Sequence, residues 1–383
     1  MKRLFLLLFV ILLLLACPLG YALADSTQEE LEEYVQDNVQ GLETSGLQEF
    51  CDTLGLSDGS VKDRILALVR GETTSPRAIL SGVWEIMTTG VRECVPALVA
   101  ILAIAILYNM LFGLTQGFAG KSTVEVVHLV CYAAILATVV SLVVGVVSAV
   151  RQTADRLVNL MGVVTPPLMT LTTVLGGNVS AGVLKPQLAL FSTLLARIIA
   201  AVVIPLFLVS VVLSVVGNLS DNLRLNKLVS AVRYLIGCVL GVSFGLYTTY
   251  LTVAGVAGSM ADTVSIRAAR YVIGNYVPLV GGYISQGFDL IATSLSLIKN
   301  ALGAYAMVLT VAIVLRPLVK VLLLTVGLKL ASGLIQPVGD QRMATMVGSV
   351  GDCMRSLTAA MAGIGFAFLI TMLLVMSSTT MVL

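Results

Sequence analysis

Two arginines inside long apolar segments are the residues of this sequence best suited to chemistry. Arg197 lies ten residues into segment 187–216, and Arg316 lies beside Pro317 in segment 303–330. A charge at the centre of a membrane helix costs about 2.5–3.5 kcal/mol, so such a residue usually faces the bundle interior or a water-filled cavity. Both are candidate functional residues, in a conduit or at a contact between subunits. The alternative is a structural arginine that reaches the interface or pairs with backbone carbonyls.

The remaining polar residues form no catalytic set. His128, the only histidine, lies one turn from Glu125, which is compatible with a proton relay or with an ordinary polar residue at the membrane interface. The sequence has no P-loop, no H-E-x-x-H motif and no CxxC pair among its six cysteines. It therefore predicts a protein that is not an enzyme and that has neither a cofactor nor a metal site.

The amino-acid composition indicates what kind of structure holds these residues in place. Hydrophobic residues make up 58% of the 383 residues, charged residues only 11%, and the mean hydropathy is +1.00. Soluble domains carry about 25% charged residues, so this chain has too few charges to cover a water-facing surface. The 23 basic and 21 acidic residues nearly balance, which gives no support to nucleic-acid binding. The sequence predicts an all-α polytopic protein of the lipid bilayer.

The N-terminus resembles a secretory signal. Lys2 and Arg3 precede an apolar run, and the small residues Ala22 and Ala24 form an A-x-A cleavage site. Residues 1–24 are therefore expected to be a signal peptide. The alternatives are an uncleaved anchor and lipidation at Cys17.

Residues 25–91 are expected to form an acidic helical head outside the cytoplasm. Residues 25–93 hold 14 acidic and 5 basic side chains, a net charge of −9, whereas residues 94–383 carry +9. Apolar residues at helical spacing predict three short helices, the last beginning after Ser60. Their core is thin, so the head is expected to pack on the membrane body or on a partner. A structural disulfide between Cys51 of the head and Cys94 at the membrane boundary is an alternative that the sequence favours less than two unpaired cysteines.

Six apolar segments predict membrane-spanning helices, and two further segments are ambiguous. The six are 95–113, 126–149, 187–216, 234–258, 303–330 and 357–376. The ambiguous segments are 157–176, which contains Pro166, Pro167 and a Gly-Gly pair, and 272–298, which contains Pro278, Gly281 and Gly282. Both are interpreted as proline- and glycine-broken hairpins, interfacial or re-entrant, because 272–298 also carries Asn275, Gln286 and Asp289. If both instead span, the body has eight helices in a three-plus-three inverted repeat.

Equal spacings suggest an internal duplication. Pro166 and Pro278 are 112 residues apart, as are Pro205 and Pro317. The expected organisation is a first transmembrane pair over 92–150, repeats over 151–258 and 263–376, and a tail over 377–383. Arg233 and Arg355 also correspond, at an offset of 122.

A stripe of glycines predicts close helix packing. Gly237, Gly241 and Gly245 recur every fourth residue within the segment 234–258. Such a G-x-x-x-G pattern lets two membrane helices approach closely. The pattern leaves open whether the partner helix is intramolecular or belongs to another subunit.

Four stretches carry a resemblance to a known family. They are YNMLFGL at the end of the first span, VVHLVCYAAIL at 126–136, TPPLMTLTTVLGG, and the long segment 265–300 that begins SIRAARYVIGNYVP. With the order of signal, acidic head and membrane body, these stretches resemble the stage III sporulation protein AE family of endospore-forming bacteria.

The resemblance implies a place and a role. Members sit in the mother-cell membrane around the engulfed forespore, in a secretion-like channel complex with other stage III sporulation proteins. That complex is joined across the intermembrane space to a forespore membrane protein, and it is required for activity of the late forespore sigma factor, sigma G. The resemblance transfers no catalytic residues. A small-solute permease is the alternative function.

Overall fold

The computed structural model describes residues 28–55, 59–71, 76–118, 121–218, 225–276, 281–337 and 340–380. The expected signal peptide at 1–24, Cys17 and Pro278 lie outside these ranges. The helices are α2 (Gln28–Gln40), α3 (Ser45–Thr53), α4 (Val61–Val69), α5 (Pro76–Phe118), α6 (Lys121–Val174), α7 (Asn178–Ile198), the π-helix η1 (Ile199–Val203), α8 (Ile204–Gly217), α9 (Asn226–Tyr276), α10 (Gly281–Ile335) and α11 (Gln341–Thr380).

The predicted fold class is confirmed. The described residues contain no strand, and six of their helical segments are long and apolar enough to cross a membrane. They are Ser81–Leu114, Glu125–Val174, Asn178–Gly217, Asn226–Val264, Ile291–Ile335 and Gln341–Ser377. Each contains one of the six spans that the sequence predicts. The protein is an all-α polytopic membrane protein.

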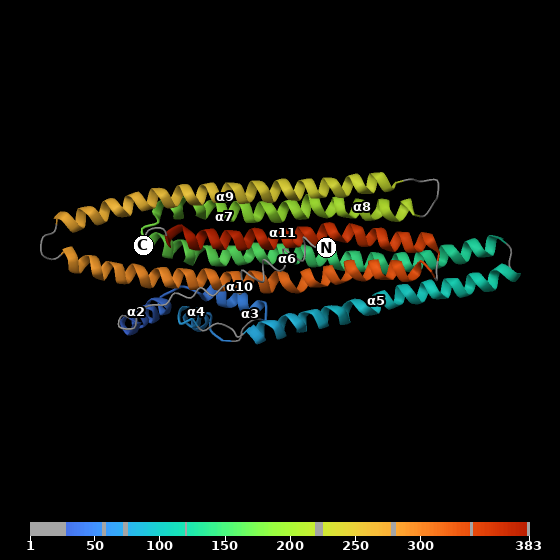
Figure 1. Ribbon diagram of the computed structural model, residues 1–383, viewed down its shortest axis with the longest axis horizontal. Helices are drawn as coiled ribbons and strands as arrows, with labels where there is room; N and C mark the ends of the chain where they lie inside the picture. The colour runs from blue at the N-terminus through green and yellow to red at the C-terminus, as the bar shows by residue number, and fades with distance from the viewer. Residues whose placement is uncertain are drawn as a thin grey trace.

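The helices form an elongated bundle around α11. Helices α9, α7–α8, α11, α6 and α10 run side by side, and α5 lies along the outside (Figure 1). In the most apolar 18-residue stretch of α11, 61% of the residues are buried, whereas only 17% are buried in the corresponding stretches of α5 and α9. Helix α11 is therefore the central element, and the exposed apolar faces of α5 and α9 are suited to lipid or to another protein.

The bundle is much longer than a bilayer is thick. Helices α6, α9 and α10 contain 54, 51 and 55 residues, which at 1.5 Å per residue is roughly 76–83 Å. The hydrocarbon core of a bilayer is only about 30 Å thick. A large part of the bundle must therefore project beyond the membrane.

The head packs against one half of this bundle. Its core is formed by the buried residues Val35, Val39, Leu47, Val61 and Ile65, and Ser60 caps α4 by accepting a hydrogen bond from the backbone N–H of Lys62 at 3.3 Å. Cys51 Sγ lies 3.4 Å from Tyr305 Oη on α10. The head lies beside the half where α6 and α9 end, away from the C-terminal ends of α5, α8 and α10 (Figure 1).

The prediction of a hairpin over 157–176 is wrong. Helix α6 continues through Pro166 and Pro167, and the chain reverses only at Leu175–Gly177, where Gly176 has a φ of +88°. A proline inside a helix removes one hydrogen bond and costs about 3 kcal/mol. Burial of Leu157, Leu160, Met161, Val164 and Leu168 on both sides of the prolines offsets that cost.

The second predicted hairpin falls on the connection between α9 and α10. Helix α9 extends to Tyr276 and α10 begins at Gly281–Gly282, whereas residues 277–280 lie outside the described ranges. Pro166 lies within a continuous helix, and the equivalence of the two segments stays a prediction. The duplication of 151–258 and 263–376 stays a prediction.

Candidate functional site

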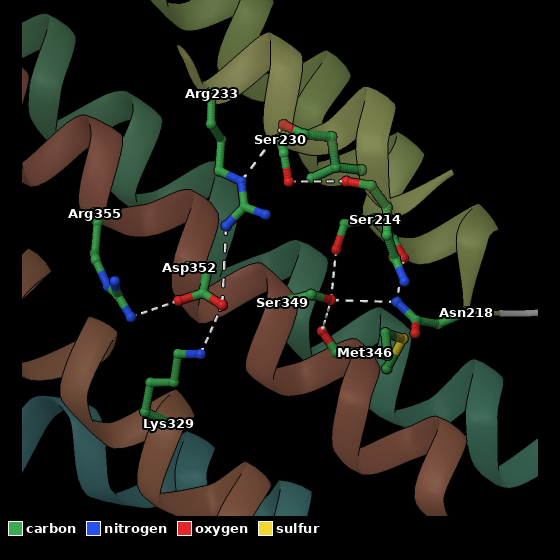
Figure 2. A network of polar contacts seen from close by, with 11 residues as sticks. Ser214, Asn218, Ser230, Arg233, Lys329, Met346, Ser349, Asp352 and Arg355 are labelled. Atoms are coloured by element: carbon green, nitrogen blue, oxygen red, sulfur yellow. Dashed lines mark hydrogen bonds and ion pairs between the residues drawn. The ribbon is translucent and has the colours of Figure 1, made fainter. Parts of the chain in front are cut away.

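Three membrane helices bring three cations to one carboxylate. Asp352 of α11 accepts hydrogen bonds from Lys329 Nζ of α10 at 2.7 Å and from Arg355 Nη2 at 2.6 Å. Arg233 Nη1 of α9 lies 3.9 Å from the same carboxylate (Figure 2). We call these four residues the Asp352 cluster. Their formal charges sum to +2.

The cluster is partly buried. The side chains of Asp352 and Arg233 are 26% and 27% exposed, whereas Lys329 is 39% and Arg355 66% exposed. Partial burial weakens screening by solvent, so these ion pairs stabilise the helix contacts more than surface pairs do. The cluster therefore both connects α9, α10 and α11 and presents excess positive charge at their junction.

Uncharged polar groups extend the cluster to α8. Ser214 Oγ donates to Ser349 Oγ at 2.6 Å, and Asn218 Nδ2 donates to the same oxygen at 3.3 Å (Figure 2). Asn218 Nδ2 also donates to the Ser214 carbonyl at 2.6 Å, near the C-terminal end of α8. Helices α8, α9 and α10 are thus each connected to α11 through polar side chains of α11.

The sequence did not predict this cluster. In the sequence, Arg233 and Arg355 are only corresponding positions of the proposed repeats, and the structure brings both to one carboxylate. Sequence analysis missed Asp352, although Asp352 is the only acidic residue within α11. A single acid in an apolar helix is a signal that could have found it, because such a charge requires a partner.

The two arginines predicted to be functional lie outside the bundle. Arg316 is 71% exposed, and its Nη2 lies 3.9 Å from Glu93 of α5, which also accepts a hydrogen bond from Lys320 at 2.6 Å. Arg197 is exposed on α7, directly before η1. Neither side chain faces the interior of this bundle, and a place in a conduit stays a prediction for both. A contact with another subunit also stays a prediction for both.

His128 bonds to a different partner from the one that the sequence suggested. Its Nε2 lies 2.6 Å from Asp340 Oδ2, and its ring contacts Tyr108 edge-on and stacks on Tyr132. Asp340 also caps α11 by accepting from the Arg342 N–H at 3.1 Å. This pair attaches the start of α6 to the start of α11, which favours a structural role.

A second buried acid holds two helices together. Asp262 of α9 is 1% exposed, and its two oxygens accept hydrogen bonds from Val179 N and Ser180 N, both at 2.9 Å. It therefore caps the N-terminus of α7 from another helix, where the helix dipole favours a negative charge. The sequence does not reveal this contact, because the partners are 82–83 residues apart.

The glycine stripe faces away from the bundle. Gly237, Gly241 and Gly245 are exposed, and a Cβ added at any of them would meet nothing within 4 Å. The stripe is thus not used for packing within the chain. By contrast, a Cβ on Gly363 of α11 would overlap the ring of Phe244.

The open space at Gly241 and the close contact at Gly363 predict different effects of adding a side chain at the two positions. Gly241→Leu should leave the melting temperature of the purified protein within about 2 °C, because an exposed substitution costs at most about 0.5 kcal/mol. Gly363→Leu should lower it strongly, because overpacking typically costs 1–3 kcal/mol or more. Thermal unfolding in detergent measures both. Equal losses in the two variants would show that the stripe packs against this chain.

The described residues contain no group of three metal-ligating side chains. Cys51 and Cys94, the alternative disulfide pair, are both free thiols. Cys51 contacts Tyr305, whereas Cys94 lies near the backbone of α10, with its Sγ 4.0 Å from the Lys320 carbonyl oxygen.

Fold and site together define a multi-pass membrane protein with a helical head and a charged helix junction. The family profile of Stage III sporulation protein AE matches residues 60–379, so the chain belongs to this family. It is similar to Stage III sporulation protein AE of Bacillus subtilis (strain 168), with 22% identity over 362 residues, covering 91% of this chain and 89% of that protein. No solved structure matches the chain. Family membership assigns the protein a role in sporulation.

Proposed function

We propose that this protein is a non-enzymatic membrane component of a channel complex between the mother cell and the forespore. It would lie in the mother-cell membrane around the forespore and support activity of the late forespore sigma factor after engulfment. Its partners would be other stage III sporulation membrane proteins and, across the intermembrane space, a forespore membrane protein. Membership in the sporulation family is the main support.

The length of the bundle is the structural observation that best supports this proposal. Helices of 51–55 residues exceed the bilayer, and the head packs against the half that would project from it. A rigid projection with an acidic head offers a large surface to neighbouring components. A protein acting only within the bilayer would not need this extension.

The charge distribution gives only weak support to an orientation with the head outside the cytoplasm, because basic residues such as Arg151, Arg156 and Lys185 also lie toward the head side. The C-terminal ends of α5, α8 and α10 share the end of the bundle opposite the head (Figure 1). Near that end lie Lys121 at the start of α6, Lys227 and Arg233 near the start of α9, and Arg342 at the start of α11. Basic residues in short loops favour the cytoplasmic side.

One observation favours the alternative, a small-solute permease. A cavity of about 230 Å³ lies between α6 and α7, lined partly by Thr165, Lys185, Ser192 and Thr193. Hydroxyl groups and one ammonium could bind a small polar solute. The cavity opens beside Pro166, where α6 lacks a backbone donor.

Charge removal at the exposed arginines distinguishes the two functions. Arg197→Gln and Arg316→Gln should leave assembly and forespore sigma-factor activity within about twofold of wild type, because both side chains lie outside the bundle. A forespore reporter gene and co-purification of partners would measure the two properties. Loss of reporter activity with assembly intact would favour the permease.

A further inference from the structure

The Asp352 cluster has more positive charge and more hydrogen-bond donors than its one carboxylate can satisfy. Each guanidinium has five N–H donors and the ammonium has three. Within the described chain, Lys329 and Arg355 each donate once to Asp352, and Arg233 Nε donates to the Val229 carbonyl of its own helix at 3.5 Å. Most donors of the three cations are therefore available to a second anion.

The surroundings of the cluster indicate what kind of anion this is. A net charge of +2 at a partly buried site is costly unless a counterion approaches it. Exposed apolar residues adjoin two of the cations: Tyr234 and Leu235 follow Arg233 and are 74% and 51% exposed, and Leu330 follows Lys329 and is 63% exposed. All lie within candidate membrane spans. A ligand here should combine an anionic group with apolar chains.

We propose that the Asp352 cluster binds the phosphate of an anionic phospholipid, whose acyl chains lie on the neighbouring faces of α9 and α10. Arginine forms paired hydrogen bonds with phosphate oxygens, and lysine binds phosphate as a point charge. Basic sites between membrane helices are suited to anionic headgroups. The bound lipid joins α9 and α10 at the same point where Asp352 joins them.

Lipid binding to the purified full-length protein tests this proposal. Native mass spectrometry in detergent would compare phosphatidylglycerol with zwitterionic phosphatidylcholine. Each charge near an anionic headgroup contributes about 1 kcal/mol, or about fivefold in affinity. Arg233→Gln, Lys329→Gln and Arg355→Gln should each weaken phosphatidylglycerol binding about fivefold, whereas Arg233→Lys should retain most of it. Asp352→Asn, which removes the competing carboxylate, should strengthen it.

Arg316→Gln is the matched control, because it removes a cation from α10 outside the cluster. Equal binding of both lipids, or an equal loss in Arg316→Gln, would overturn the proposal. Displacement of phosphatidylglycerol by millimolar inorganic phosphate would assign the site to free phosphate instead. Unchanged phosphatidylglycerol binding in folded Arg233→Gln, Lys329→Gln and Arg355→Gln would show that the cations serve only to hold the helices. Size-exclusion profiles and melting temperatures identify any variant that fails to fold. If the glutamine variants do not fold, Arg233→Lys, which keeps the positive charge, is the variant that tests the site.

Discussion

Replacing Asp262 by alanine is expected to destabilise the bundle by about 2–4 kcal/mol. The substitution leaves the N–H groups of Val179 and Ser180 without an acceptor at a buried helix end. An unsatisfied buried donor costs about 1–3 kcal/mol, and loss of an N-cap costs about 0.5–2 kcal/mol. Asp262→Asn retains one acceptor oxygen and should lose roughly half as much. Thermal unfolding of the detergent-purified protein provides the measurement.

Asp155→Ala is the control for this substitution. Asp155 is an exposed acid on α6 in the same half of the bundle, so its loss should change the melting temperature by no more than 1–2 °C. An equal loss in the two variants would mean that the Asp262 cap contributes little. Correct membrane insertion should be checked for both, because α7 begins at the capped end.

Asp352→Leu is expected to have the second large effect, about 2–3 kcal/mol of destabilisation. It leaves three cations close together without their shared carboxylate. Breaking a buried ion pair from one side costs about 3–5 kcal/mol, and the partial exposure of this cluster reduces that value. The effect should be larger at low ionic strength, because salt screens the remaining repulsion.

A double-mutant cycle isolates this contribution. Lys329→Met combined with Asp352→Leu should be more stable than the sum of the single changes predicts, with a coupling energy of about 1 kcal/mol or more. Lys320→Met is the control partner, because Lys320 pairs with Glu93 rather than with Asp352. Coupling of the same size to Lys320 would contradict the assignment of Lys329 to this carboxylate.

The six spans could be predicted from the sequence, because each is a predominantly apolar run of about the length that a bilayer requires. The path of α6 through Pro166 and Pro167 could not, because local proline chemistry predicts a break. Continuity depends instead on the burial of Leu160 and Leu168 by other helices. Local preference was overridden by tertiary packing.

The candidate site was predictable only in part. An apolar segment indicates that an arginine lies in a helix, but only the neighbouring helices decide whether it faces inward. For this reason Arg316 was expected inside and is 71% exposed. Asp262 accepts hydrogen bonds from backbone groups that are 82–83 positions away. Asp352 contacts the neighbouring Arg355, but also Lys329 and Arg233, which are 23 and 119 positions away. No local sequence pattern encodes pairs that are so far apart in the chain.

Cysteine labelling in intact cells tests most directly the claim that the head and half of the bundle project from the outer face of the membrane. Exposed cysteines would replace Glu49 in the head, Arg156 on the projecting part of α6 and Lys227 at the opposite end, with exposed Cys238 changed to serine. A membrane-impermeant maleimide should label Glu49→Cys and Arg156→Cys in intact protoplasts, and Lys227→Cys only after permeabilisation. Labelling of Lys227→Cys in intact protoplasts, or protection of Arg156→Cys, would contradict the account.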